Sequence, residues 1–82
     1  MKVLKFYADW CGPCKTYAPI FEKAANEIGF DYENIDVDKD TSGLAAEYKI
    51  RSIPATVFIH EDGTFVKEVG LLTEEKIKQL IK

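Results

Sequence analysis

Two cysteines three positions apart, Cys11 and Cys14, are the residues of this chain whose types and spacing can do chemistry. They stand between an apolar run over 3–10 and a stretch that favours a helix. A spacing of i and i+3 brings both side chains onto one face of a first helical turn, close enough for a disulfide. The unpaired N–H groups and the positive end of the helix dipole at that turn favour an anion, so we expect the first thiol to be stabilised as a thiolate. Because thiolates attack disulfides, the pair indicates a redox couple.

Other uses of this cysteine pair fit the sequence less well. A structural disulfide is typical of secreted miniproteins with more cysteines, whereas this chain has two and no secretion signal. A zinc site needs roughly four ligands, and beyond the pair the chain offers only His60, at the far end of an expected strand. Acidic residues within 36–47 match the spacing of a calcium loop, but Thr41 occupies the position that requires glycine. We therefore expect no metal, and no cofactor beyond the redox-active disulfide itself.

Length and composition limit the remaining possibilities. The 82 residues, 46% of them hydrophobic, suffice for a single domain over 1–82 with one core. Eleven basic and 14 acidic side chains give a net charge of −3 and are interspersed, which argues against a nucleic-acid partner. No apolar segment approaches the roughly 18 residues of a membrane span, and the first is too short for a secretion signal. We expect a cytoplasmic protein that binds neither nucleic acid nor membrane.

The hydrophobic pattern predicts the element order βαβαββα. The expected strands cover residues 3–8, 30–37, 55–60 and 64–69. The expected helices begin at Pro13, near Leu44 and after Thr73. The first helix ends at Gly29 and contains Pro19, which should kink it. The first crossover requires parallel pairing, whereas the short turn at 61–63 permits only an antiparallel hairpin. The sequence thus predicts an α/β protein with a four-stranded mixed sheet and helices on both faces.

The segment Ala-Asp-Trp-Cys-Gly-Pro-Cys-Lys at 8–15, together with Pro19, Ile53-Pro54 and Gly70, resembles the thioredoxin family. The predicted element order agrees with this resemblance, which covers essentially the whole chain. It begins at what would be the second strand of a full-length member, so the usual initial strand and helix are absent and the strand over 30–37 becomes a sheet edge. The resemblance implies a thioredoxin fold and a small dithiol-disulfide oxidoreductase that reduces protein disulfides.

The resemblance also implies roles for individual residues. Cys11 would be the exposed nucleophile and Cys14 the more buried resolving thiol. Pro54 would be a cis proline facing them, so that the backbone of Ile53 is free to pair with an extended substrate. The residues that would line this substrate groove are Trp10, Gly12, Pro13, Ile53, Pro54 and Gly70. Judged singly, Trp10 could instead be core, Pro54 an ordinary trans proline and Gly70 the end of a strand.

Lys5 is the most consequential departure from the family pattern. Thioredoxins usually carry a buried aspartate six positions before the first cysteine, where it handles the proton of the resolving thiol. A lysine there would stabilise a thiolate electrostatically, and if desolvated it could lose its proton and act as a base toward Cys14. Lys5 is thus a candidate catalytic residue. The alternative is a lysine whose stem lies along apolar surface while its ammonium reaches water.

The partners also follow from the resemblance. Disulfide-containing proteins would be the substrates, and a flavin-dependent thioredoxin reductase would recharge a monomeric protein. Two other functions stay open at this stage. One is a glutaredoxin-like electron donor recharged by glutathione, and the other is a non-catalytic binding module that uses the groove as an interaction surface.

Overall fold

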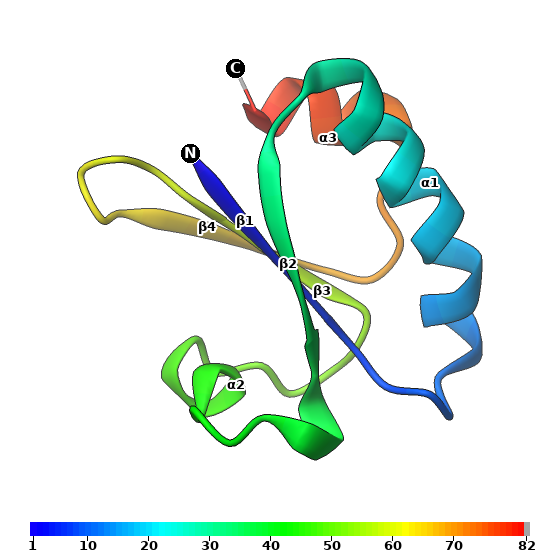
Figure 1. The fold of residues 1–82 in the computed structure, drawn as a ribbon, viewed down its shortest axis with the longest axis vertical. Helices are drawn as coiled ribbons and strands as arrows, with labels where there is room; N and C mark the ends of the chain where they lie inside the picture. The colour runs from blue at the N-terminus through cyan, green and yellow to red at the C-terminus, as the bar shows by residue number, and fades with distance from the viewer. Residues whose placement is uncertain (82) are drawn as a thin grey trace.

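The computed structural model describes residues 1–81 and contains a twisted four-stranded sheet flanked by helices (Figure 1). The strands are β1 (Lys2–Tyr7), β2 (Asp31–Asp36), β3 (Ala55–Ile59) and β4 (Phe65–Val69). The helices are α1 (Gly12–Ile28), α2 (Leu44–Glu47) and α3 (Glu74–Ile81), and a short 3-10 helix, η1 (Val37–Lys39), follows β2. The predicted order βαβαββα is confirmed. Each strand begins and ends within one residue of its expected position.

The strand order across the sheet is β2-β1-β3-β4. β1 is parallel to β2 and antiparallel to β3, and β3 forms an antiparallel hairpin with β4. Both predicted pairing types are therefore confirmed, and β2 is an edge strand as expected. Exposed Asp31 and Glu33 lie on this edge, where their charges disfavour pairing with another chain.

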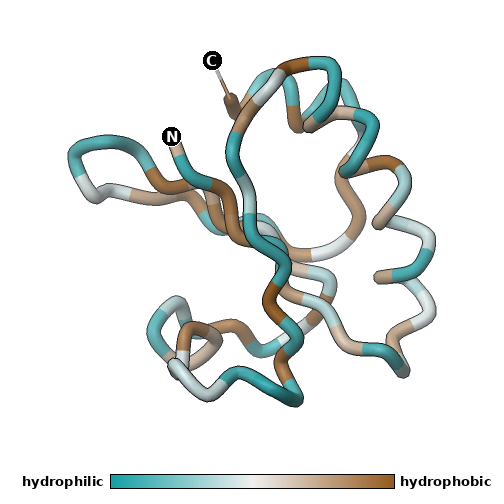
Figure 2. Tube along the Cα trace, in the orientation of Figure 1, coloured by the Kyte–Doolittle hydropathy of each residue, from teal (hydrophilic) through white to brown (hydrophobic). Residues whose placement is uncertain are grey.

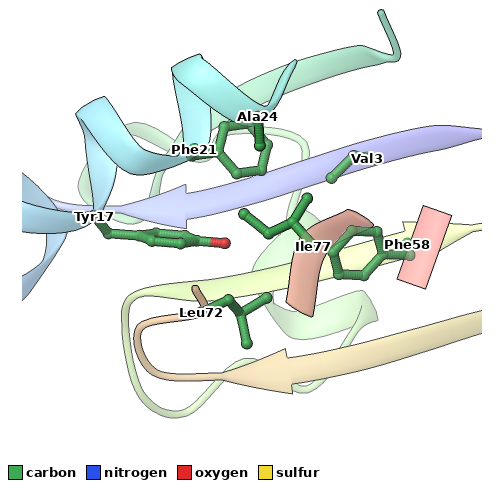
Figure 3. Packing of buried hydrophobic residues seen from close by; sticks show 7 residues of the cluster. All are labelled: Val3, Tyr17, Phe21, Ala24, Phe58, Leu72 and Ile77. Carbon is green, nitrogen blue, oxygen red and sulfur yellow. The ribbon is translucent and has the colours of Figure 1, made fainter. Parts of the chain in front are cut away.

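Two hydrophobic layers cover the two faces of the sheet. The layer beneath α1 and α3 joins residues of both helices to the central strands (Figure 3): Val3, Tyr17, Phe21, Ala24, Phe58, Leu72 and Ile77. The layer on the α2 face contains Leu4, Phe6, Ile35, Ala55 and Val57. Successive residues of β1 alternate between the layers, because side chains of a strand point to opposite faces in turn. Hydrophobic stretches accordingly follow the central strands, whereas the tip of the β3–β4 hairpin is hydrophilic (Figure 2).

β2 changes the face on which it buries apolar residues partway along its length. Phe30 and Tyr32 meet the ring of Phe21, with centroids 5.6 and 4.9 Å away, whereas Ile35 belongs to the opposite layer. In the sequence, Phe30 and Tyr32 alternate together while Ile35 and Val37 have the opposite parity, a pattern that predicts either partial burial on both faces or a bulge. Because 31–36 pair with 2–7 without interruption, the structure has partial burial on both faces.

Local hydrogen bonds explain where the helices begin and end. Gly29 has φ 84° and donates its N–H to Ala25 O at 2.7 Å, which ends α1 as expected. Asp40 accepts the N–H groups of Leu44 and Ala45 at 3.1 and 2.8 Å and so caps α2. Pro19 lies inside α1, and the kink there stays a prediction. Within residues 1–81, no helix has the length and apolar character needed to cross a membrane.

A buried polar pair links α1 to β3. The Tyr17 and Thr56 hydroxyl oxygens lie 2.9 Å apart, and both residues are fully buried. The change Tyr17→Phe would leave the Thr56 hydroxyl unpaired, so we expect the free energy of unfolding to fall by about 1–3 kcal/mol at pH 7 in urea titrations. Adding Thr56→Val removes the orphaned hydroxyl and should restore most of this loss. A double variant no more stable than the single one would contradict the prediction.

The same pair makes the free energy of unfolding depend on pH in alkaline solution. Burial raises the pKa of Tyr17 to about 12 from 10.0, although the hydrogen bond with Thr56 acts in the opposite direction. Because the pKa is raised in the folded state, this contribution to stability is complete below pH 10.0 and is lost as the pH rises through about 12. Over that window the wild-type chain should lose more stability than Tyr17→Phe. Equal losses would show that the phenol does not titrate with folding.

Candidate redox site

Cys11 occupies the position that caps the N-terminus of α1. Its backbone is extended, with φ −86° and ψ 106°, and its Sγ accepts the N–H of Cys14 at 3.2 Å. The first turn carries no acidic side chain that would compete for the positive end of the dipole. Cys11 and Cys14 are joined as a disulfide, with their Cα atoms 5.3 Å apart. The spacing thus places the sulfurs as the sequence predicts, with the Sγ of Cys11 directed at the start of the helix.

The relative exposures of the two cysteines differ from the expectation. We expected an exposed Cys11 and a more buried Cys14, but their exposed fractions are 4% and 6%. Both belong to a small buried cluster with Ala8, against which Ile53 packs. In the disulfide state Cys11 Sγ lies under the 53–54 segment, 3.8 Å from Ile53 O, whereas Cys14 borders a cavity on the α1 side of the sheet. These contacts explain why Cys11 is not the more exposed cysteine in this state.

The segment next to Cys11 carries the residues expected to form a groove. The Ile53–Pro54 peptide bond is cis, as the resemblance implies, and Pro54 is buried. Pro54 O accepts the N–H of Gly70 at 2.8 Å, which ties the segment to the end of β4. Among residues 1–81, no protein group accepts the Ile53 N–H. The segment beside Cys11 thus carries a backbone N–H that makes no internal hydrogen bond among the described residues.

Trp10 is a surface residue, so the alternative that it belongs to the core is wrong. Its side chain is 69% exposed, and its indole Nε1 donates to Asp38 Oδ2 at 2.8 Å. Gly12 and Pro13 are also exposed at the start of α1. Sequence reasoning did not identify Asp38 as a partner, because no local pattern joins two polar groups that lie 28 positions apart.

A cavity of about 310 Å³ lies beneath the disulfide, between α1 and the first two strands. Its lining residues are Lys5, Tyr7, Ala8, Asp9, Cys14, Lys15, Ala18, Glu22 and Asn34. Cys14 thus shares the cavity with Lys5, the departure from the family pattern. The sequence analysis missed Glu22. Its signal was the spacing of Cys14, Ala18 and Glu22, which at intervals of four residues lie on one helix face.

Lys5 is buried in this site, with only 5% of the residue exposed. Burial lowers the pKa of its ammonium, and the nearby charge of Glu22 opposes that shift. Lys5 Nζ lies 5.2 Å from the ring centroid of Phe21 and 6.0 Å from that of Tyr7. In the described part of the chain, no side-chain nitrogen or oxygen is both fully buried and without a hydrogen bond. Since no protein group within 1–81 accepts a hydrogen bond from Lys5 Nζ, this atom retains contact with solvent.

Comparison with known proteins shows the family of this chain. The family model described as Thioredoxin matches residues 1–82. The chain belongs to the thioredoxin family. A thioredoxin of Mycoplasmoides gallisepticum is 38% identical over 81 residues, which cover 98% of this chain and 80% of that protein. Thioredoxin-2 of Dictyostelium discoideum is 42% identical over 67 residues, or 80% of this chain and 74% of that protein.

Solved thioredoxin structures share the fold. A single-site mutant of the thioredoxin of Halobacterium salinarum superposes with a TM-score of 0.86 at 36% identity, covering 98% of this chain and 70% of that one. The Drosophila thioredoxin Deadhead gives a TM-score of 0.84 at 34% identity, covering 98% of this chain and 76% of that one. Family membership and the disulfide between Cys11 and Cys14 identify the chain as a dithiol-disulfide oxidoreductase that acts on protein disulfides.

Proposed function

We propose that this thioredoxin-family chain works in the reducing direction, with Cys11 as the attacking thiolate and Cys14 as the resolving thiol. Cys11 Sγ attacks a substrate disulfide and forms a mixed disulfide, and one substrate sulfur leaves as a thiolate. Cys14 then attacks Cys11 Sγ, which releases the second substrate sulfur and closes the Cys11–Cys14 disulfide. Two electrons pass to the substrate in each cycle.

The hydrogen bond from Cys14 N–H to Cys11 Sγ is the observation that carries this assignment. It shows that the cap position of α1 directs a backbone donor at the sulfur of Cys11. A thiolate formed there gains this bond and the favourable end of the helix dipole, which lowers the pKa of the thiol and increases the population of the nucleophile.

We further propose that substrates bind beside Cys11 as an added strand. The unused Ile53 N–H supplies a backbone donor for an extended segment. Exposed Trp10 and the residues Gly12, Pro13, Pro54 and Gly70 complete this groove. Because the groove offers few charged side chains, it suits an unfolded or extended protein segment that carries a disulfide.

The physiological setting in this proposal is a cytoplasmic monomer recharged by a flavin-dependent thioredoxin reductase. A reductase pair must return to the dithiol after each cycle, and the cytoplasm supplies the reductants that keep thiols reduced. No cofactor of its own is required, since the two sulfurs carry both electrons.

Reduction of insulin disulfides by the purified chain tests the proposed direction and coupling together. We expect catalysis with dithiothreitol, and equally with NADPH and a thioredoxin reductase in its place. Glutathione with glutathione reductase should give little turnover. Turnover with glutathione alone would instead identify a glutaredoxin-like donor, and absence of catalysis with every reductant would favour a binding module.

A further inference from the structure

We propose that Lys5 is a fixed positive charge that stabilises the thiolate of Cys14 through the shared cavity, and that Glu22 moderates its effect. This inference rests on the proposed role of Cys14 as the resolving thiol. It assigns positioning roles to both residues, since neither bonds to the substrate. The sequence analysis gave two direct functions for Lys5, an electrostatic stabiliser or a base, and we propose the first.

Lys5 and Glu22 line the same cavity as Cys14. Cys14 is among the residues that line the cavity and Cys11 is not, so the cavity borders the pair on the Cys14 side. Lys5 projects from β1 onto the α1 face, since it shares the parity of Val3, which packs in the α1 layer. Glu22 reaches the same cavity from α1, two turns beyond Cys14. A change of charge at Lys5 should therefore shift the pKa of the Cys14 thiol more than that of the Cys11 thiol.

The surroundings of Lys5 favour its charged form. Its Nζ keeps contact with solvent and lies over the ring of Phe21 at 5.2 Å, an arrangement that favours a cation. Glu22 adds a negative charge that also favours the protonated amine. Burial acts in the other direction, but the contact with solvent limits the cost of keeping the charge.

Water screens the charged groups around the cavity to different extents. The titratable groups around the cavity besides the cysteine are Lys5, Tyr7, Asp9, Lys15 and Glu22. Asp9, Lys15 and Glu22 are exposed, so solvent weakens their fields. Lys5 is buried. Because its surroundings have a low dielectric constant, its electrostatic field is screened less than those of the exposed groups. Although the formal charges cancel, Lys5 dominates the field at Cys14.

This field acts on the second step of the cycle. The Cys14 thiol gives its proton to cavity water, and the thiolate attacks Cys11 Sγ of the mixed disulfide. The bond between Cys11 Sγ and the substrate sulfur breaks, and that sulfur leaves with the electron pair. A cation beside Cys14 lowers the pKa of this thiol and so raises the thiolate fraction at neutral pH. Lys5 holds its own proton throughout.

Reaction of the reduced chain with Ellman's disulfide reagent separates the two steps. Attack by Cys11 releases a first coloured thiolate, and resolution by Cys14 releases a second from the same molecule. We expect Lys5→Met to raise the pH midpoint of the second phase by about one unit. Because a thiol of higher pKa is also more nucleophilic, the second-phase rate at pH 7 should fall only about 3- to 10-fold. Lys5→Arg should keep the wild-type midpoint, and Glu22→Gln should lower it by a smaller amount.

Lys2→Met is the matched control, because Lys2 lies on the same strand but outside the cavity and should leave both phases unchanged. A second-phase midpoint that does not move in Lys5→Met would overturn the inference. So would Lys5→Arg behaving like Lys5→Met, since that result identifies a proton acceptor. Loss of the first phase in the wild-type chain would instead refute the proposed function.

Discussion

Replacing Cys11 by serine should abolish insulin reduction, leaving only the rate that dithiothreitol achieves without the protein. A serine hydroxyl is not ionised at neutral pH, so the helix N-terminus has no anion to stabilise there. Cys14 should not take over the attack, because Cys14 lines the cavity beneath the pair, whereas Cys11 Sγ lies 3.8 Å from Ile53 O in the segment proposed to bind the substrate. The measurement is the initial rate of insulin precipitation at equal protein concentrations.

Cys14→Ser is the matched control for this change. It also lacks the disulfide, so any general effect of losing that cross-link is common to both variants, and urea titrations of the two should agree. Only Cys14→Ser should still react with an alkylating reagent as rapidly as the reduced wild-type chain at neutral pH. Activity in Cys11→Ser, or a mixed disulfide formed through its Cys14, would show that the attacking sulfur has been misassigned.

Cys14→Ser itself should complete the first step and stop. Cys11 attacks the substrate as before, but no second thiolate is present to release it, so one equivalent of mixed disulfide should accumulate. Non-reducing electrophoresis and mass spectrometry would detect this adduct. Dithiothreitol should reduce the mixed disulfide and release the substrate. With NADPH and a thioredoxin reductase as the electron source, in the absence of dithiothreitol, multiple turnover should be lost while a single turnover of attack remains.

The control for trapping is the double variant Cys11→Ser with Cys14→Ser, which should form no adduct. If Cys14→Ser forms no adduct while it still alkylates rapidly, then Cys11 is reactive but the groove does not admit the substrate. Sustained turnover of Cys14→Ser with glutathione and glutathione reductase would mean that glutathione resolves the intermediate, which is the behaviour of a glutathione-coupled donor.

The fold followed from local patterns that act over short stretches of sequence. The hydrophobic pattern predicted the strands, Gly29 marked the end of α1, and the three-residue turn at 61–63 required a hairpin. Each of these signals comes from residues that are close together in the sequence. Tertiary packing reinforced them instead of overriding them, and the strand bounds agree with the structure for that reason.

The details of the site depended on contacts that local patterns do not encode. Burial of Cys11 depends on Ile53, 42 positions away, and the exposed indole of Trp10 is held by Asp38. The cavity is lined by residues of α1 and of the first two strands, so only the structure shows that Lys5 and Cys14 share one space. A lysine on an apolar strand is compatible with several environments, and the sequence could not select among them.

The rate of alkylation of Cys11 as a function of pH, in the reduced chain with Cys14→Ser, tests the central claim most directly. That claim is that the start of α1 stabilises the Cys11 thiolate through the helix dipole and the backbone N–H of residue 14. The account predicts a titration midpoint at least one unit below about 8.5, the pKa of a free thiol. A midpoint at or above that value would contradict it.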